Sequence, residues 1–143
     1  MIQISDQNLT AIKQHGEREY PYECCGLLIG SFDGDEKTVV ETLPIENAKA
    51  DEEKHNRSLI LPTDLLRGER YAREKGLDVI GNYHSHPDDR AVPSQFDLDH
   101  ALPVWSYIVV SVRQGEAVEA RSWVMENDRS KFNEEEIVQE GNK

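Results

Sequence analysis

The chain has 143 residues with 28 acidic against 16 basic side chains, so its formal net charge is -12 at pH 7. This excess of acid excludes a basic nucleic-acid footprint and a polybasic membrane anchor, because phosphates and anionic lipids would repel the surface. No apolar run approaches the roughly 18 residues that cross a bilayer, and Met1–Asp6 lacks the layout of a signal peptide. We therefore expect one cytoplasmic domain spanning residues 1–143.

The first part of the chain predicts a helix followed by two paired strands. Apolar residues at helical spacing predict a helix that begins after Ser5 and ends between Gly16 and Tyr20. The short apolar run over 24–30 is typical of a buried strand. An Asp-Gly-Asp turn then leads into a second strand over 38–42.

The middle of the chain predicts a loop, a helix and a third strong strand. Residues 47–57 are polar without periodicity, which favours a surface loop that borders a substrate groove, and a short strand follows at 58–61. A helix is expected from Pro62 to a left-handed cap at Gly76, before a strand over 77–83. The buried stripe of that helix is predicted from its apolar spacing to be Leu65, Leu66, Tyr71 and Ala72.

The last part of the chain predicts a second hairpin and a frayed C-terminal segment. Strands over 107–112 and 117–125 flank a polar turn. Residues 127–143 include an acidic run that we expect to fray. Helices mixed with antiparallel strand pairs predict an α/β sandwich with a mixed, mainly antiparallel sheet.

The adjacent thiols Cys24 and Cys25 are the only cysteines of the chain. A disulfide between neighbours would need a strained ring, so reduced thiols are expected, in agreement with a cytoplasmic setting. The alternative, a zinc-binding thiolate pair, usually requires a spacer of two residues.

A second set of residues has the chemistry of a metal site. His84 and His86 are two apart in an extended segment, so both imidazoles point to the same side. Asp97 follows, in the first turn of a predicted helix with Ser94 near its N-cap. Two imidazoles, one carboxylate and a water would give zinc four ligands with one exchangeable position, as hydrolytic zinc requires.

A simpler interpretation exists for each of these residues. Ser94 and Asp97 have the spacing of a capping box, which alone would explain them. The combination of two histidines with a returning acid favours the metal site. The other histidines, His15, His55 and His100, are interpreted as surface or helix-face residues.

Hydrolysis at such a site also needs a proton acceptor, for which a carboxylate is suited. Glu23 stands immediately before the first buried strand and is therefore attached to a rigid element. An exposed acid at the entry to a strand is the alternative interpretation of this residue.

Three segments resemble, in order, the JAMM (MPN-plus) zinc metalloprotease family: YPYECCGLLIG at 20–30, GNYHSHP at 81–87 and PSQFD at 93–97. The resemblance implies that His84, His86 and Asp97 bind one zinc ion per chain. It also implies that Glu23 is the general base and acid and that Ser94 helps to hold the tetrahedral intermediate.

The same resemblance implies an α-β-α sandwich like that of cytidine deaminases and peptidase or isopeptidase chemistry on ubiquitin-like proteins. A compact chain is similar to the prokaryotic branch, some of whose members cut after the C-terminal Gly-Gly of ubiquitin-like sulfur carriers. The substrate is then a protein, and neither nucleic acid nor membrane is a partner.

Three alternatives use the same fold or the same metal. A noncatalytic MPN-type scaffold typically lacks the ligand set that this chain contains. A nucleobase deaminase would need His-x-Glu and a later Pro-Cys-x-x-Cys, neither of which occurs. A structural zinc would need a fourth protein ligand, for which only Cys24 or Cys25 is at hand.

Overall fold

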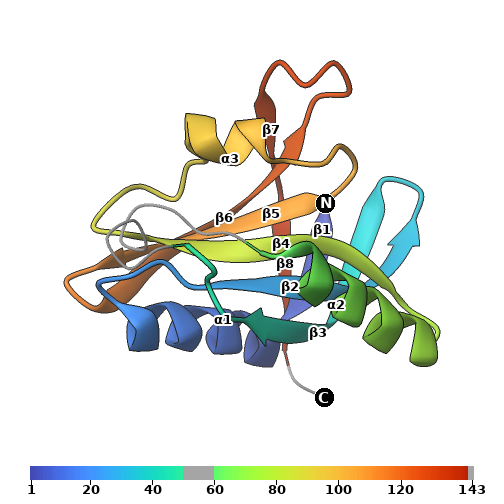
Figure 1. Cartoon of the computed structure of the whole chain (residues 1–143), viewed down its shortest axis with the longest axis horizontal. Coiled ribbons are helices and arrows are strands. Elements are labelled where there is room, and N and C mark those ends of the chain that lie inside the picture. Colours follow the sequence, from blue (N-terminus) through green and yellow to red (C-terminus); the bar gives the residue numbers. More distant parts are fainter. Residues whose placement is uncertain (50–59, 142–143) are drawn as a thin grey trace.

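Figure 1 shows a computed structural model of the chain, which describes residues 1–49 and 60–141. Their strands form one eight-stranded sheet with the order β7-β6-β5-β4-β2-β3-β1-β8. The elements in chain order are β1 (Ile2–Ser5), α1 (Asp6–Glu19), β2 (Cys25–Asp33), β3 (Glu36–Ile45), α2 (Pro62–Glu74), β4 (Asp78–Pro87), α3 (Gln95–Asp99), β5 (Ser106–Arg113), β6 (Glu116–Met125), β7 (Phe132–Glu135) and β8 (Ile137–Glu140).

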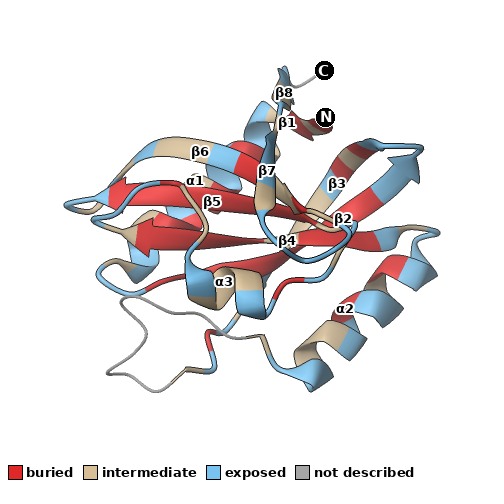
Figure 2. Ribbon diagram, turned by 90° about the horizontal axis from the view of Figure 1, so that it is seen from above, coloured by how far each residue is buried: buried red, intermediate tan, exposed pale blue. Residues whose placement is uncertain are grey.

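The sheet is mixed, as the sequence predicts. The pairs β1–β3, β1–β8 and β4–β5 are parallel, whereas β2 pairs antiparallel with β3 and β4, and β6 pairs antiparallel with β5 and β7. Helix α1 covers one face and α2 the other, so the predicted α-β-α sandwich is confirmed (Figure 1). The central strands are buried on both faces (Figure 2), which explains why β2 and β5 read as continuous apolar runs.

The C-terminal segment differs from the expected frayed tail. Strands β7 and β8 are separated only by Glu136, yet they lie at opposite ends of the strand order. Ile2 N donates to Glu136 O at 2.9 Å, and Ile137 packs against the core. Residues 132–140 are thus largely in strands rather than frayed, and the half-buried Glu135 accepts hydrogen bonds from Ser106 Oγ and Ser122 Oγ.

Helix α1 begins and ends as its local sequence dictates. Ser5 Oγ accepts a hydrogen bond from Asn8 N at 3.0 Å, which caps the helix. The helix continues past Gly16, which packs closely against the sheet: a Cβ there would lie 3.1 Å from Val112 Cγ2. This end at Glu19 agrees with the longer of the two predicted limits.

Helix α2 confirms its predicted cap but not its whole predicted stripe. Gly76 has φ of 72°, the left-handed conformation expected after the helix. Ala72 is buried, whereas Leu66 is 51% exposed, so Leu66 does not belong to the buried stripe. Residues 50–57 of the predicted loop and 58–59 of the predicted strand lie outside the described residues, and Ile60 and Leu61 are not in a strand.

Strand β4 is longer than the sequence predicts. It continues beyond Tyr83 to Pro87 because β5 pairs with it in parallel along this whole length, with His84 opposite Val109 and His86 opposite Ser111. The motif histidines therefore belong to the middle of a sheet, not to a loop. Among the described residues, no helix is long and apolar enough to cross a membrane.

Candidate metal centre

Two histidines of β4 form the base of the site. Successive side chains of a strand point to opposite faces of the sheet, so His84 and His86, which are two residues apart, share one face. The centroids of their rings are 5.0 Å apart. They are 4% and 6% exposed. Strand β5 pairs with β4 at both histidines, and β2 also pairs with β4 at His84. This pairing gives the two imidazoles a rigid backbone.

Asp97 approaches the two imidazoles from helix α3. Its Oδ2 lies 3.2 Å from His84 Nε2 and 3.2 Å from His86 Nε2. The same oxygen accepts a hydrogen bond from Ser94 N at 2.8 Å, and Ser94 Oγ accepts one from Asp97 N at 3.1 Å. The capping box predicted as the simpler interpretation is therefore present, and it aims the carboxylate at both histidines.

A main-chain carbonyl orients His86. Arg90 O lies 2.9 Å from His86 Nδ1, so the ring donates its Nδ1–H there and directs the Nε2 lone pair into the site. The loop that supplies this carbonyl is itself fixed, because Trp123 Nε1 donates to Ala91 O at 3.0 Å and Ser111 Oγ donates to Asp89 O. Because every residue has a main-chain carbonyl, the sequence does not indicate which one orients His86.

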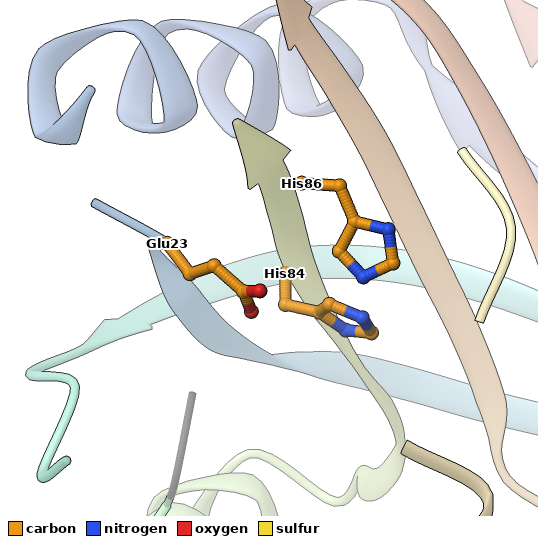
Figure 3. A group of neighbouring side chains, drawn as sticks. All are labelled: Glu23, His84 and His86. Atoms are coloured by element: carbon orange, nitrogen blue, oxygen red, sulfur yellow. The ribbon is translucent and has the colours of Figure 1, made fainter. Parts of the chain in front are cut away.

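Glu23 completes the cluster. It is 4% exposed, so the interpretation as an exposed acid at a strand entry is wrong. A carboxylate oxygen of Glu23 and one ring nitrogen each of His84 and His86 lie within 4.8 Å of one another. Figure 3 shows Glu23 reaching toward the two rings from the segment before β2. This buried group is able to hold a metal ion.

The charges of the cluster favour a cation. Burial would raise the pKa of Asp97, but the adjacent His84 and the hydrogen bonds from both histidines and Ser94 N hold that pKa far below its usual range. Burial would lower the pKa of His84, but Asp97 and then Glu23 reverse this and raise it to about 9. The site thus attracts positive charge, and its imidazole nitrogens and carboxylate oxygens suit zinc and related divalent ions.

The remaining sequence candidates do not belong to the described cluster of Glu23, His84 and His86. Cys24 and Cys25 are free and buried, and burial raises the pKa of the Cys24 thiol to about 12, so the thiol stays protonated. His15 lies 2.8 Å from the Tyr83 hydroxyl on the other face of β4. His100 ends α3, and His55 lies outside the described residues.

A cavity of about 250 Å³ opens beside His84 and Asp97. Its walls are mostly apolar and aromatic, so it offers a surface for substrate next to the cluster. The other lining residues are Cys25, Leu27, Ile60, Leu65, Asn82, Tyr83, Phe96, His100, Leu102, Trp105 and Tyr107.

Comparison with known proteins gives consistent matches. Residues 5–126 match the family of prokaryotic homologs of the JAB domain. A desampylase from Haloferax volcanii is 31% identical over 107 residues, which is 74% of this chain and 74% of that protein. The solution structure of a protein from Desulfitobacterium hafniense is 28% identical, with a TM-score of 0.86 over 99% of this chain and 94% of that chain.

A crystal structure of a JAB1/MPN domain protein from Archaeoglobus fulgidus has a TM-score of 0.57 and covers 96% of this chain and 97% of that chain. At 20% identity this likeness shows the fold alone. The sandwich described above is thus the fold of a JAB1/MPN domain.

Proposed function

Because the chain belongs to the family of prokaryotic homologs of the JAB domain, we propose that it is a zinc-dependent peptidase or isopeptidase that cleaves after the C-terminal Gly-Gly of a ubiquitin-like protein. The family match confirms the resemblance of the three sequence segments to JAMM proteins. The observation that carries the proposal is the pair of buried imidazoles that has Asp97 Oδ2 at 3.2 Å from each Nε2 and a Glu23 carboxylate oxygen within 4.8 Å of a nitrogen of each ring.

In this proposal His84, His86 and Asp97 hold the zinc. Asp97 is preferred over Glu23 as the third ligand because its Oδ2 is equally distant, at 3.2 Å, from both Nε2 atoms and is fixed by the capping box. Three protein ligands leave a coordination position open, as catalytic zinc sites do. Zinc bound there would supply Lewis acidity and lower the pKa of a coordinated water toward about 7.

Glu23 is then the group that moves protons. It is buried beside the histidines, and the carboxylate takes a proton from the attacking water and returns it to the departing nitrogen. Ser94 Oγ accepts a hydrogen bond from Asp97 N, and a hydroxyl that accepts still carries a proton to donate. We assign that proton to the oxygen of the tetrahedral intermediate.

The substrate class rests on the family and on the relation to a desampylase, which supports a ubiquitin-like protein, such as a sulfur carrier, as the partner. Glycine has no side chain to clash, so a Gly-Gly tail can lie in an extended form close to a buried site. The noncatalytic scaffold is disfavoured, because such a role needs no buried set of metal ligands.

Mass spectrometry of ubiquitin-like proteins with C-terminal extensions, before and after incubation with the zinc-loaded protein, tests the proposal. We expect a product that ends at Gly-Gly and a sharp loss of cleavage when a bulky residue replaces the penultimate glycine. The matched control is the His84→Ala/His86→Ala variant, which should release nothing. Equal cleavage of an unrelated unfolded protein would instead indicate a general peptidase and contradict the assignment.

A further inference from the structure

Glu23 differs from the histidines in what holds its backbone. His84 and His86 lie within β4, whereas Glu23 lies in a stretch that belongs to no helix or strand. The pairing of β2 with β4 ends at Cys25, which is opposite His84. The regular sheet therefore does not fix the position of Glu23, although proton transfer depends on that position to a fraction of an ångström.

Ser85 holds one side of the peptide group that follows Glu23. Cys24 N donates to Ser85 Oγ at 2.8 Å, and Ser85 N donates to Cys24 O at 3.2 Å. The Ser85 side chain is fully buried and points to the face opposite the two histidines between which it stands. Gly16 of α1 closes this space, since a Cβ on Gly16 would lie 3.3 Å from Ser85 Cβ.

Asn47 holds the other side of the same peptide group. Its Nδ2 donates to Glu23 O at 3.1 Å in a buried hydrogen bond, and its Oδ1 accepts from Lys49 N at 3.0 Å. Glu23 O and Cys24 N belong to a single planar amide. Because Asn47 binds its carbonyl and Ser85 binds its N–H, the rotation of that plane is restrained, and the direction of the Glu23 side chain is restrained with it.

We propose that Ser85 and Asn47 are positioning residues that fix the Glu23–Cys24 peptide plane and thereby the Glu23 carboxylate relative to the two imidazoles. Ser85 does this from the strand residue between His84 and His86, so one short segment of β4 sets the position of all three groups. This role rests on the proposed function, in which Glu23 transfers protons.

Steady-state kinetics of three serine variants tests the role of Ser85. Ser85→Ala should lower kcat by about 10–100-fold through misplacement of the carboxylate, while KM and zinc content stay unchanged. Ser85→Cys keeps the size of the side chain but offers only a weak sulfur acceptor, so its kcat should lie between those of Ser85→Ala and the wild type. The matched control is Ser122→Ala, which also removes a fully buried serine hydroxyl, one that donates to Glu135 at 2.7 Å, and should leave kcat nearly unchanged.

Asn47→Asp tests the same peptide plane from its other side, with a side chain of nearly the same size. The aspartate keeps the oxygen that accepts from Lys49 N but loses the donor to Glu23 O. We expect a fall in kcat similar to that of Ser85→Ala, and a double variant whose loss is smaller than the product of the two, because both act on one amide. This variant carries the test if Ser85→Ala fails to fold.

Hydrogen exchange of the Cys24 amide separates this role from the proposed function, because it needs no substrate. The rate should rise at least about 10-fold in Ser85→Ala and stay unchanged in Ser122→Ala. If the wild-type protein cleaves no ubiquitin-like protein, the proposed function fails, and unaltered exchange in Ser85→Ala would independently overturn the positioning role. That role is also overturned if Ser85→Ala turns over like Ser122→Ala or loses zinc together with activity.

Discussion

Both faces of β4 carry buried polar side chains, but the side chains on the two faces have different kinds of partner. On the face toward α1, Tyr83 meets His15 at 2.8 Å and Ser85 meets Cys24 N at 2.8 Å, so donors meet acceptors. On the other face, His84 and His86 meet carboxylates. A neutral imidazole nitrogen and a carboxylate both offer electron pairs, so these groups bind well together only around a proton or a metal ion.

The polar groups on the α1 face therefore stabilise the fold, whereas those on the other face form the candidate site. Polar groups that satisfy one another inside the chain contribute to the free energy of unfolding. Carboxylates that face imidazole nitrogens instead form a group able to hold a cation, and the same carboxylates, Asp97 and then Glu23, raise the pKa of His84 to about 9 despite its burial. Substitutions on the two faces should therefore change different measured quantities.

The largest effect is expected from His84→Ala combined with His86→Ala, which removes both nitrogen ligands. Metal analysis should show one zinc per wild-type chain and none in the double variant, with complete loss of turnover. Full zinc content in the double variant would show that the metal binds elsewhere.

Glu23→Gln should separate proton transfer from metal binding. The amide keeps the volume of the carboxylate but cannot accept the proton, so turnover should fall by about 10²–10⁴-fold while zinc content stays at one per chain. Kinetics and metal analysis on the same preparation measure both. Wild-type activity in this variant would assign Glu23 a structural role only.

Ser94→Ala distinguishes a role of Ser94 in capping α3 from a role in catalysis. The test is needed because the structure contains the complete capping box. Loss of an oxyanion donor should reduce kcat by about 10²–10³-fold, whereas loss of an N-cap alone costs about 0.5–2 kcal/mol in the free energy of unfolding. We expect the rate loss with zinc retained. Ser94→Thr, which can still cap and donate, is the control, and a stability loss without a rate loss would favour the cap.

The sequence predicts those features of the fold and of the candidate site that depend on local periodicity. The spacing of His84 and His86 placed them on one face, and the Ser94–Asp97 spacing predicted the capping box. The fold class followed from apolar runs and turns in the same way. The prediction could not show that one carboxylate oxygen caps the helix and also faces both histidines.

The features that the sequence did not predict depend on contacts between distant segments. Strands β1 and β8 have weak local signals and form by pairing with each other across nearly the whole length of the chain. The burial of Glu23, the hydrogen bond that Asn47 donates and the one that Ser85 accepts likewise depend on residues distant in sequence. His15 lies on a face of α1, as one of the two interpretations expects, but it is buried rather than at the surface, and nothing near it in the sequence indicates its contact with Tyr83.

On the α1 face, Tyr83→Phe should reduce stability without affecting the metal. It removes the hydroxyl that lies 2.8 Å from His15 Nδ1 and leaves that buried nitrogen without its hydrogen bond. The expected loss is about 1–3 kcal/mol in the free energy of unfolding, measured with urea, with unchanged zinc content. Loss of zinc in this variant would contradict the separation of the two faces.

The smallest effect concerns the pH dependence of stability through His15. Burial, and then the nearby Arg18, lower the pKa of His15 in the folded protein, despite Glu19, below its value of 6.5 in a model peptide. The unfolded chain therefore binds more protons as the pH falls below about 6.5, and the free energy of unfolding decreases there, whereas above that pH both states are neutral and the residue contributes no slope. His15→Gln keeps a polar side chain beside Tyr83 but does not titrate. The stability difference between wild type and this variant, measured with urea at pH 7.5 and 5.5, should shift against the wild type at the lower pH, and an equal difference at both would show that His15 titrates as it does in the unfolded chain.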